Sequence, residues 1–183
     1  FQARFPQERI RLIDSSVGIV IEACSSGQAD FGLCFAKNLP ASIEFTPLAD
    51  DRYVAAWRHD HPLARKTHLS WQAYFEQDYI GLDRVSGNRT LLDRELAHLT
   101  PARPSICETR HVTTMLGLVE AGIGIAAVPA MSMPAGEHSV LRAVPLTDPV
   151  VTRTVGLIRL SGRIQSYVAA ELEKLIIEQY PSG

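Results

Sequence analysis

The chain has 183 residues, with 18 basic and 20 acidic side chains, a formal net charge of −2, 46 % hydrophobic residues and 21 % charged residues. This length predicts one large domain or two small lobes that bury a core without disulfides or metal. The composition excludes a disordered tail, a collagen-like repeat and a disulfide-rich miniprotein, and the near-neutral charge argues against a nucleic-acid-binding surface on this segment.

The first elements read as a strand, a helix and a second strand. Apolar and basic side chains alternate over residues 9–14, which predicts a strand. The polar cluster 14–16 then offers N-cap residues to an amphipathic helix that ends at Gly27. The nearly continuous apolar run 29–35 predicts a strand covered on both faces. We therefore expect a parallel strand–helix–strand unit with a right-handed crossover.

The rest of the chain alternates short apolar runs with amphipathic segments. Strands are predicted over residues 43–48, 53–57, 79–82, 105–108, 123–128, 140–144 and 152–160. Helices are predicted over residues 71–75, 86–99, 109–121 and 166–180. Residues 59–70 are polar and contain proline, which favours a loop. This alternation predicts an α/β fold.

Motifs that could carry chemistry have structural explanations. Gly122–Ala127 spells G-x-G-x-x-A, but it follows a helix and precedes a strand, the reverse of a dinucleotide-binding fingerprint, so a helix end is expected. His59-Asp60-His61 lacks a third metal ligand and reads as a solvated loop. Asp50 and Asp51 would point to opposite faces of a strand, so a turn is expected rather than an acid–base pair. We predict no catalytic residues, metal or cofactor, and hence no enzyme.

The cysteines and the hydropathy of the sequence bear on the cellular compartment of the protein. Cys24, Cys34 and Cys107 lie among apolar residues without any C-x-x-C spacing, which predicts buried, reduced thiols. No run approaches the roughly 18 apolar residues of a membrane span, and no signal peptide opens the chain. We expect a cytoplasmic protein without membrane contact.

Three polar clusters stand where a predicted strand gives way to a predicted helix, at residues 14–16, 85–89 and 109–114. In open α/β sheets, ligands bind beyond the carboxyl ends of strands, and helix N-termini there attract anions. For Ser16 and Ser86, plain N-capping and ligand contact are both open, since one hydroxyl can do either.

Several motifs occur in a fixed order along the chain: Phe1–Pro6, Ala29–Leu33, His61–Ala64, Ser86-Gly87, Leu118–Pro129 and Arg153–Leu157. Together, and over essentially the whole chain, they resemble the effector-binding (substrate-binding) domain of LysR-type transcriptional regulators. The resemblance implies a two-lobed α/β fold like that of type 2 periplasmic binding proteins. Each lobe would be a mixed sheet flanked by helices, and two crossing strands would join the lobes.

The resemblance also implies an organisation for the whole regulator. Residues 1–57 plus 159–183 would form lobe I, lacking its first strand and most of its first helix, and residues 58–158 would form lobe II. The N-terminal winged helix-turn-helix is absent from this chain, so DNA would be bound only through that missing domain. The full protein would be a homodimer or homotetramer.

A small effector, expected to be a small carboxylate, would bind in the cleft between the lobes. The effector-binding candidates that the motifs imply are Ser16, Ala36, Lys37, Ser86, Gly87, His111, Val112 and Thr113. Trp57 is expected at the hinge. Peroxide-sensing members carry a cysteine pair around the segment that matches Ser86–Leu92, and this chain has none there. The alternative function is a periplasmic solute-binding protein of a transporter, which a signal peptide before Phe1 would indicate.

Overall fold

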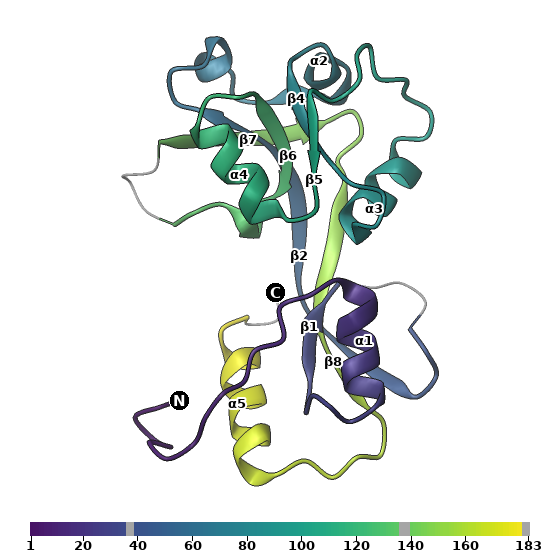
Figure 1. Ribbon diagram of the computed structural model, residues 1–183, viewed down its shortest axis with the longest axis vertical. Helices are drawn as coiled ribbons and strands as arrows, with labels where there is room; N and C mark the ends of the chain where they lie inside the picture. The colour runs from purple at the N-terminus through teal and green to yellow at the C-terminus, as the bar shows by residue number, and fades with distance from the viewer. Residues whose placement is uncertain (36–38, 136–139, 181–183) are drawn as a thin grey trace. The chain divides into compact units, whose positions relative to one another are not determined.

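The computed structural model describes residues 1–35, 39–135 and 140–180 (Figure 1). The chain forms two compact units. Unit 1 consists of Phe1–Asp50 and Arg153–Gly183, and unit 2 of Asp51–Thr152. The chain crosses between them within β2 (Ile43–Arg58) and near the start of β8 (Thr152–Leu160). Both crossings come earlier in the chain than the expected lobe boundaries. Within the described ranges, no helix has the length and apolar character that crossing a membrane requires.

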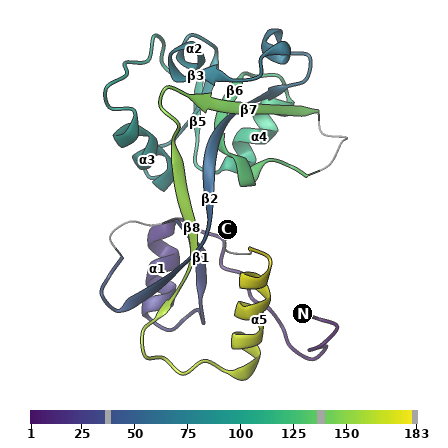
Figure 2. The ribbon, with the colours of Figure 1, turned by 180° about the vertical axis from the view of Figure 1, so that it is seen from behind.

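Unit 1 contains a small helix–sheet arrangement. Besides parts of β2 and β8, its elements are α1 (Val17–Ser25), β1 (Gly32–Cys34) and α5 (Tyr167–Glu178). β1 pairs antiparallel with β8, with Leu33 opposite Leu157. Helices α1 and α5 lie on opposite sides of this strand pair (Figures 1 and 2). The core of unit 1 is formed by Cys24, Cys34, Ile43 and Ile158.

Two predictions for unit 1 are wrong. Residues 9–14 form no strand, and Leu12 is 84 % exposed. Alternation favours a strand only where a neighbour supplies hydrogen bonds, and no described strand pairs with this segment. The apolar run 29–35 yields only the short β1, whose Leu33 is exposed rather than covered. Its partner is antiparallel, so the expected parallel crossover unit is not formed.

Unit 2 is built on a mixed sheet. Its further strands are β3 (Leu69–Ser70), β4 (Tyr79–Leu82), β5 (Cys107–Thr109), β6 (Ile125–Pro129) and β7 (Leu141–Thr147), and its helices are α2 (Trp71–Phe75), α3 (Gly87–Glu95) and α4 (Val112–Glu120). β4 lies between β5 and β6, parallel to both. β2 pairs antiparallel with β6 and with β7, and β7 runs parallel to β3.

The core of unit 2 occupies both faces of this sheet. Along β6, Ile125 and Ala127 face one hydrophobic cluster, while Ala126 and Val128 face another. This follows from the two-residue period of a strand. The first cluster includes the residues of α2, and the second includes the inner face of α4 with Met115. β6 is therefore buried throughout, which explains its uninterrupted apolar sequence.

The G-x-G-x-x-A segment has the predicted structural role. Gly122 adopts a positive φ of 77°, and its amide donates to the Val119 carbonyl at 2.9 Å, which ends α4. A Cβ on Gly124 would lie 2.5 Å from the Asp78 carbonyl oxygen. Gly122 thus ends α4, and Gly124 lets the chain pass close to the Asp78 backbone as it enters β6. This is the helix end that the order of the elements in the sequence predicted.

The predicted turn at Asp50-Asp51 is wrong, because β2 runs through both residues as one strand. Thr154 donates its hydroxyl to Asp50 Oδ1 at 2.7 Å. Asp51 is 1 % exposed, and its Oδ1 accepts from the Met131 amide at 3.0 Å. The two adjacent carboxylates point to opposite faces, as expected for a strand, and each has partners that hold it there.

Candidate functional site

The carboxyl ends of β4 and β5 lie side by side, because the two strands are parallel and Leu82 is opposite Thr109. The Asp83 amide extends this pairing by donating to the Thr109 carbonyl at 2.9 Å. α3 follows β4 and α4 follows β5 (Figure 1). The N-termini of α3 and α4 therefore follow directly after neighbouring strand ends. Open α/β sheets commonly bind their ligands at such positions. We call this feature the β4–β5 junction, with Ser86–Asn88 and His111–Thr113 as its residues.

The N-caps at this junction differ from those of α2 and α5. In α2 and α5 the preceding serine is engaged: Ser70 Oγ accepts from the Ala73 amide at 3.2 Å, and Ser166 Oγ from the Ala169 amide at 3.1 Å. Ser86 before α3 has the same extended backbone but makes no side-chain bond to its helix. His111 before α4 also makes none. Plain N-capping by Ser86, one of the two open alternatives, is therefore not observed.

The start of α3 is anchored to β2. The Tyr53 hydroxyl donates to Asn88 Oδ1 at 2.7 Å. Ser86 is 8 % exposed, and its amide donates to the Asp83 carbonyl at 3.1 Å. These bonds fix the turn in which Ser86 and Gly87 lie. The sequence did not single out Tyr53, because the tyrosine and its partner are far apart along the chain.

At the start of α4, the predicted residues have different environments. His111 and Thr113 are exposed. Val112 is half-buried and packs on the core cluster of α4. Its side chain therefore serves packing, and only its backbone could meet a polar ligand.

Charges near the junction are largely compensated. Arg110 Nε pairs with Asp83 Oδ2 at 3.2 Å. Arg89 binds Asp93 at 2.7 Å, Glu108 at 3.4 Å and the Leu82 carbonyl at 3.0 Å. Arg89 and Arg110 are thus each paired with a carboxylate, and the free amides and the dipoles of the two helix N-termini add positive potential at the junction.

The remaining predicted site residues lie elsewhere. Ser16 is exposed at the N-cap of α1 in unit 1 and makes no side-chain capping bond. Ala36 and Lys37 lie outside the described residues. Trp57 is not at a crossing between the units: it is fully buried in the core of unit 2. Its indole nitrogen is buried without a hydrogen-bond partner among the residues that the structure describes.

The His59-Asp60-His61 segment has a local structural role. His61 precedes a 3-10 helix, Pro62–Arg65, and its Nδ1 accepts from the Leu63 amide at 3.2 Å. Asp60 binds Arg58, and this bond lowers the pKa of Asp60 to about 2. In the described part of the chain, no group of three or more histidine, cysteine, aspartate or glutamate side chains could hold a metal ion.

The thiols are free rather than paired. Cys24 and Cys34 are buried as predicted, whereas Cys107 is only half-buried. Burial raises the pKa of Cys24, and burial together with the neighbouring Cys24 raises that of Cys34 to about 11. Both thiols in unit 1 are therefore protonated and poorly reactive at neutral pH.

Comparison with known proteins identifies the family. The model of the LysR substrate binding domain matches residues 1–181. The uncharacterized HTH-type transcriptional regulator YbhD of Escherichia coli (strain K12) is 36 % identical over 97 % of this chain and 56 % of its own length. The chain thus spans about half the length of this curated relative.

Solved structures show the fold. The effector binding domain of QuiR in complex with shikimate has a TM-score of 0.75 at 23 % identity, covering 91 % of this chain and 78 % of its own. The BenM effector binding domain with its effector benzoate has a TM-score of 0.74 at 24 % identity, covering 100 % and 85 %. The expected α/β fold of the type 2 periplasmic-binding-protein class is thereby confirmed. By sequence and by fold, this chain belongs to the LysR substrate binding domain family.

Proposed function

We propose that this chain is the effector-sensing domain of a LysR-type DNA-binding transcriptional regulator, and that its effector contacts the β4–β5 junction. The observation that carries this proposal is the pair of neighbouring helices whose N-cap side chains, Ser86 and His111, are not used for capping. Relatives such as YbhD are HTH-type regulators, which points to a regulatory rather than an enzymatic role.

The proposed effector is a small carboxylate. Amides at the first turns of α3 and α4 can donate to an anion, and the hydroxyls of Ser86 and Thr113 can add hydrogen bonds. Shikimate and benzoate, which accompany the QuiR and BenM domains, both carry a carboxylate. Ser16, Ala36 and Lys37 stay predicted contacts that rest on the family resemblance.

The regulator would act through parts outside this chain. DNA would be bound by a helix-turn-helix segment, in a homodimer or homotetramer in the cytoplasm. The effector would shift an equilibrium between two conformations, which requires different affinities for the two. The periplasmic solute-binding alternative loses support, because the relatives are transcriptional regulators.

The test is calorimetric titration with a panel of small carboxylates, starting from benzoate and shikimate, against the wild-type chain, Ser86→Ala and Thr113→Ala. Loss of one hydrogen bond to a charged ligand should weaken binding about tenfold in each variant. Thr67→Ala, which removes an exposed hydroxyl from the same unit, is the matched control and should bind as wild type does. Unchanged affinity in both junction variants would overturn the assignment of the site.

A further inference from the structure

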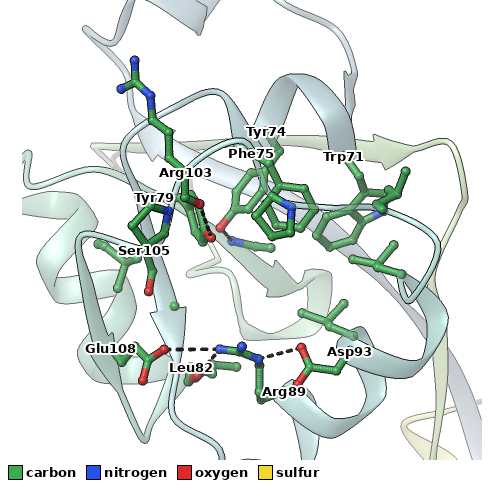
Figure 3. Close-up of a pocket in the computed structure, with 18 of the residues that line it drawn as sticks. Trp71, Tyr74, Phe75, Tyr79, Leu82, Arg89, Asp93, Arg103, Ser105 and Glu108 are labelled. Atoms are coloured by element: carbon green, nitrogen blue, oxygen red, sulfur yellow. Dashed lines mark hydrogen bonds and ion pairs between the residues drawn. The ribbon is translucent and has the colours of Figure 1, made fainter.

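Unit 2 contains a cavity that the β4–β5 junction does not use. Its volume is about 630 Å³, within the range of small-molecule pockets. Its lining includes the aromatic side chains of α2 and Tyr79 of β4 (Figure 3), as well as leucines of α3 and of the segment that follows it. None of the junction residues Ser86–Asn88 and His111–Thr113 lines it.

The aromatic residues of the lining pack on one another and have little unsatisfied polarity; Trp71, Tyr74 and Tyr79 are buried, and Phe75 is half-buried. The rings of Trp71, Tyr74, Phe75 and Tyr79 pack with centroids between 5.2 and 5.9 Å apart. Each polar ring atom already has a protein partner. Trp71 donates to the Pro149 carbonyl at 3.0 Å, Tyr79 donates to the Arg103 carbonyl at 3.0 Å, and Tyr74 accepts from the Ala127 amide at 3.0 Å. This part of the lining therefore favours an apolar ligand, and the half-buried Phe75 is the ring on which an aromatic ligand could pack.

The charged residues of the cavity compensate one another. Arg89 is held by Asp93 and Glu108, as Figure 3 shows, and Arg103 pairs with Asp78. The lining thus offers no unpaired cation to a carboxylate. An anionic ligand would therefore meet only cations whose charge a neighbouring carboxylate already compensates, and would gain less electrostatic stabilisation here than at an unpaired cation.

One neutral hydrogen-bonding group remains available. Ser105 lines the cavity, half-buried beside Gly81, and its hydroxyl makes no side-chain hydrogen bond within the described ranges. A hydroxyl can donate and accept, so it suits a neutral partner such as a phenol. A ring system bound here would displace water from the apolar part of this lining.

We infer that this cavity is a second ligand site, which binds an uncharged aromatic alcohol of one to three rings, with Ser105 as its polar contact. The site differs from the β4–β5 junction in ligand charge: the junction attracts anions, and the cavity accepts neutral molecules. The inference does not depend on the proposed effector site, because none of the junction residues Ser86–Asn88 and His111–Thr113 lines the cavity.

A matched pair of probes tests this inference. 2-Naphthol and 2-naphthoate have the same ring system and differ in their polar group. We expect 2-naphthol to bind the wild-type chain and to shift the NMR signals of the Leu96 and Leu99 methyl groups, while 2-naphthoate binds at least tenfold more weakly at this site. Equal or tighter binding of the carboxylate there, or no methyl shift with 2-naphthol, would overturn the inference.

Two variants check the location. Ser105→Ala should weaken 2-naphthol binding about fivefold, the effect of losing one neutral hydrogen bond. Leu99→Trp, which fills the cavity from the chain segment after α3, should abolish binding, and retained methyl dispersion shows that the variant is folded. Thr113→Ala should leave 2-naphthol binding unchanged. Weakening by Thr113→Ala with no effect of Ser105→Ala would place the probe at the junction and refute the second site.

Discussion

At the scale of single residues, His61 illustrates how local contacts hold an imidazole in its neutral form. Its Nδ1 is the acceptor for the Leu63 amide, a role that requires an unprotonated nitrogen. Burial lowers the pKa of His61 from its usual value of 6.5, and the charge of Asp60 opposes this only in part. The folded chain therefore prefers neutral His61 more strongly than the unfolded chain does.

This preference predicts a pH dependence of stability. Because the folded pKa of His61 is below the unfolded value, its contribution is complete above pH 6.5 and is lost as the pH falls below it. In His61→Asn, where the amide oxygen can still accept from Leu63, urea unfolding should show a smaller decrease in stability from pH 7 to pH 5 than in wild type. His98→Asn, which changes an exposed histidine, is the control. An identical pH profile for wild type and His61→Asn would contradict this account.

At the scale of elements, helices of this chain begin in two ways. α2 and α5 begin at a serine whose hydroxyl is bonded to the helix, and α3 begins at a serine whose hydroxyl is not. An N-cap side chain that bonds to the helix contributes to folding stability. Where that bond is missing, backbone amides of the first turn stay free to donate to a ligand. The same residue type therefore caps α2 and α5 with its hydroxyl, and before α1 and α3 it leaves the hydroxyl unused for capping.

This difference predicts unequal costs of the same substitution. Ser166→Ala should lower the free energy of unfolding by about 1 kcal/mol, as loss of a helix cap does. Ser86→Ala removes no capping bond and should cost less than half of that. Chemical denaturation of the two variants, with no ligand present, measures both. A larger loss in Ser86→Ala than in Ser166→Ala would show that Ser86 has a structural role.

The sequence predicted helices and strands most accurately where the pattern of apolar residues reflects only which side chains of that segment are buried. The predicted strands 79–82 and 152–160 and the helix 71–75 have the observed bounds. Residues 9–14 have an equally clear alternation and form no strand. A strand needs a hydrogen-bonding neighbour, and a single segment of sequence carries no information about which neighbour it will have.

The same reasoning explains what could be predicted of the sites. The β4–β5 junction was accessible to prediction, because a strand, a polar cluster and a helix follow one another in the sequence. The cavity was not, since Trp71, Tyr79 and Leu96 each read as ordinary core residues. Their arrangement around a space depends on contacts between segments distant in the chain, as does the bond from Tyr53 to Asn88.

At the scale of the whole molecule, protection of the backbone is uneven. The strand β6 is buried along its length and paired on both edges, with β2 and with β4. Residues 9–15 are largely exposed, and their amides make no backbone hydrogen bond to any other described residue. Local opening should therefore require much more free energy in β6 than in the segment before α1.

Hydrogen exchange measures this difference directly. We expect the amides of residues 9–15 to exchange within seconds at neutral pH and those of Ala126 and Val128 to exchange with the slowest class in the protein. The exchange rates are measured on the chain without added ligand. Slow exchange in residues 9–15 would mean that the segment is paired in solution.

The two units differ in how the chain builds them. Unit 2 is a single uninterrupted stretch of sequence, Asp51–Thr152, inserted between two pieces of unit 1. Its two ends are adjacent, because the Tyr53 amide donates to the Val151 carbonyl at 2.9 Å. A module with neighbouring ends can be exchanged between homologous proteins at two joints, and new ends can be opened in its surface loops by circular permutation. Both the β4–β5 junction and the aromatic cavity would travel with such a module, whereas the predicted contact Ser16 would stay with unit 1.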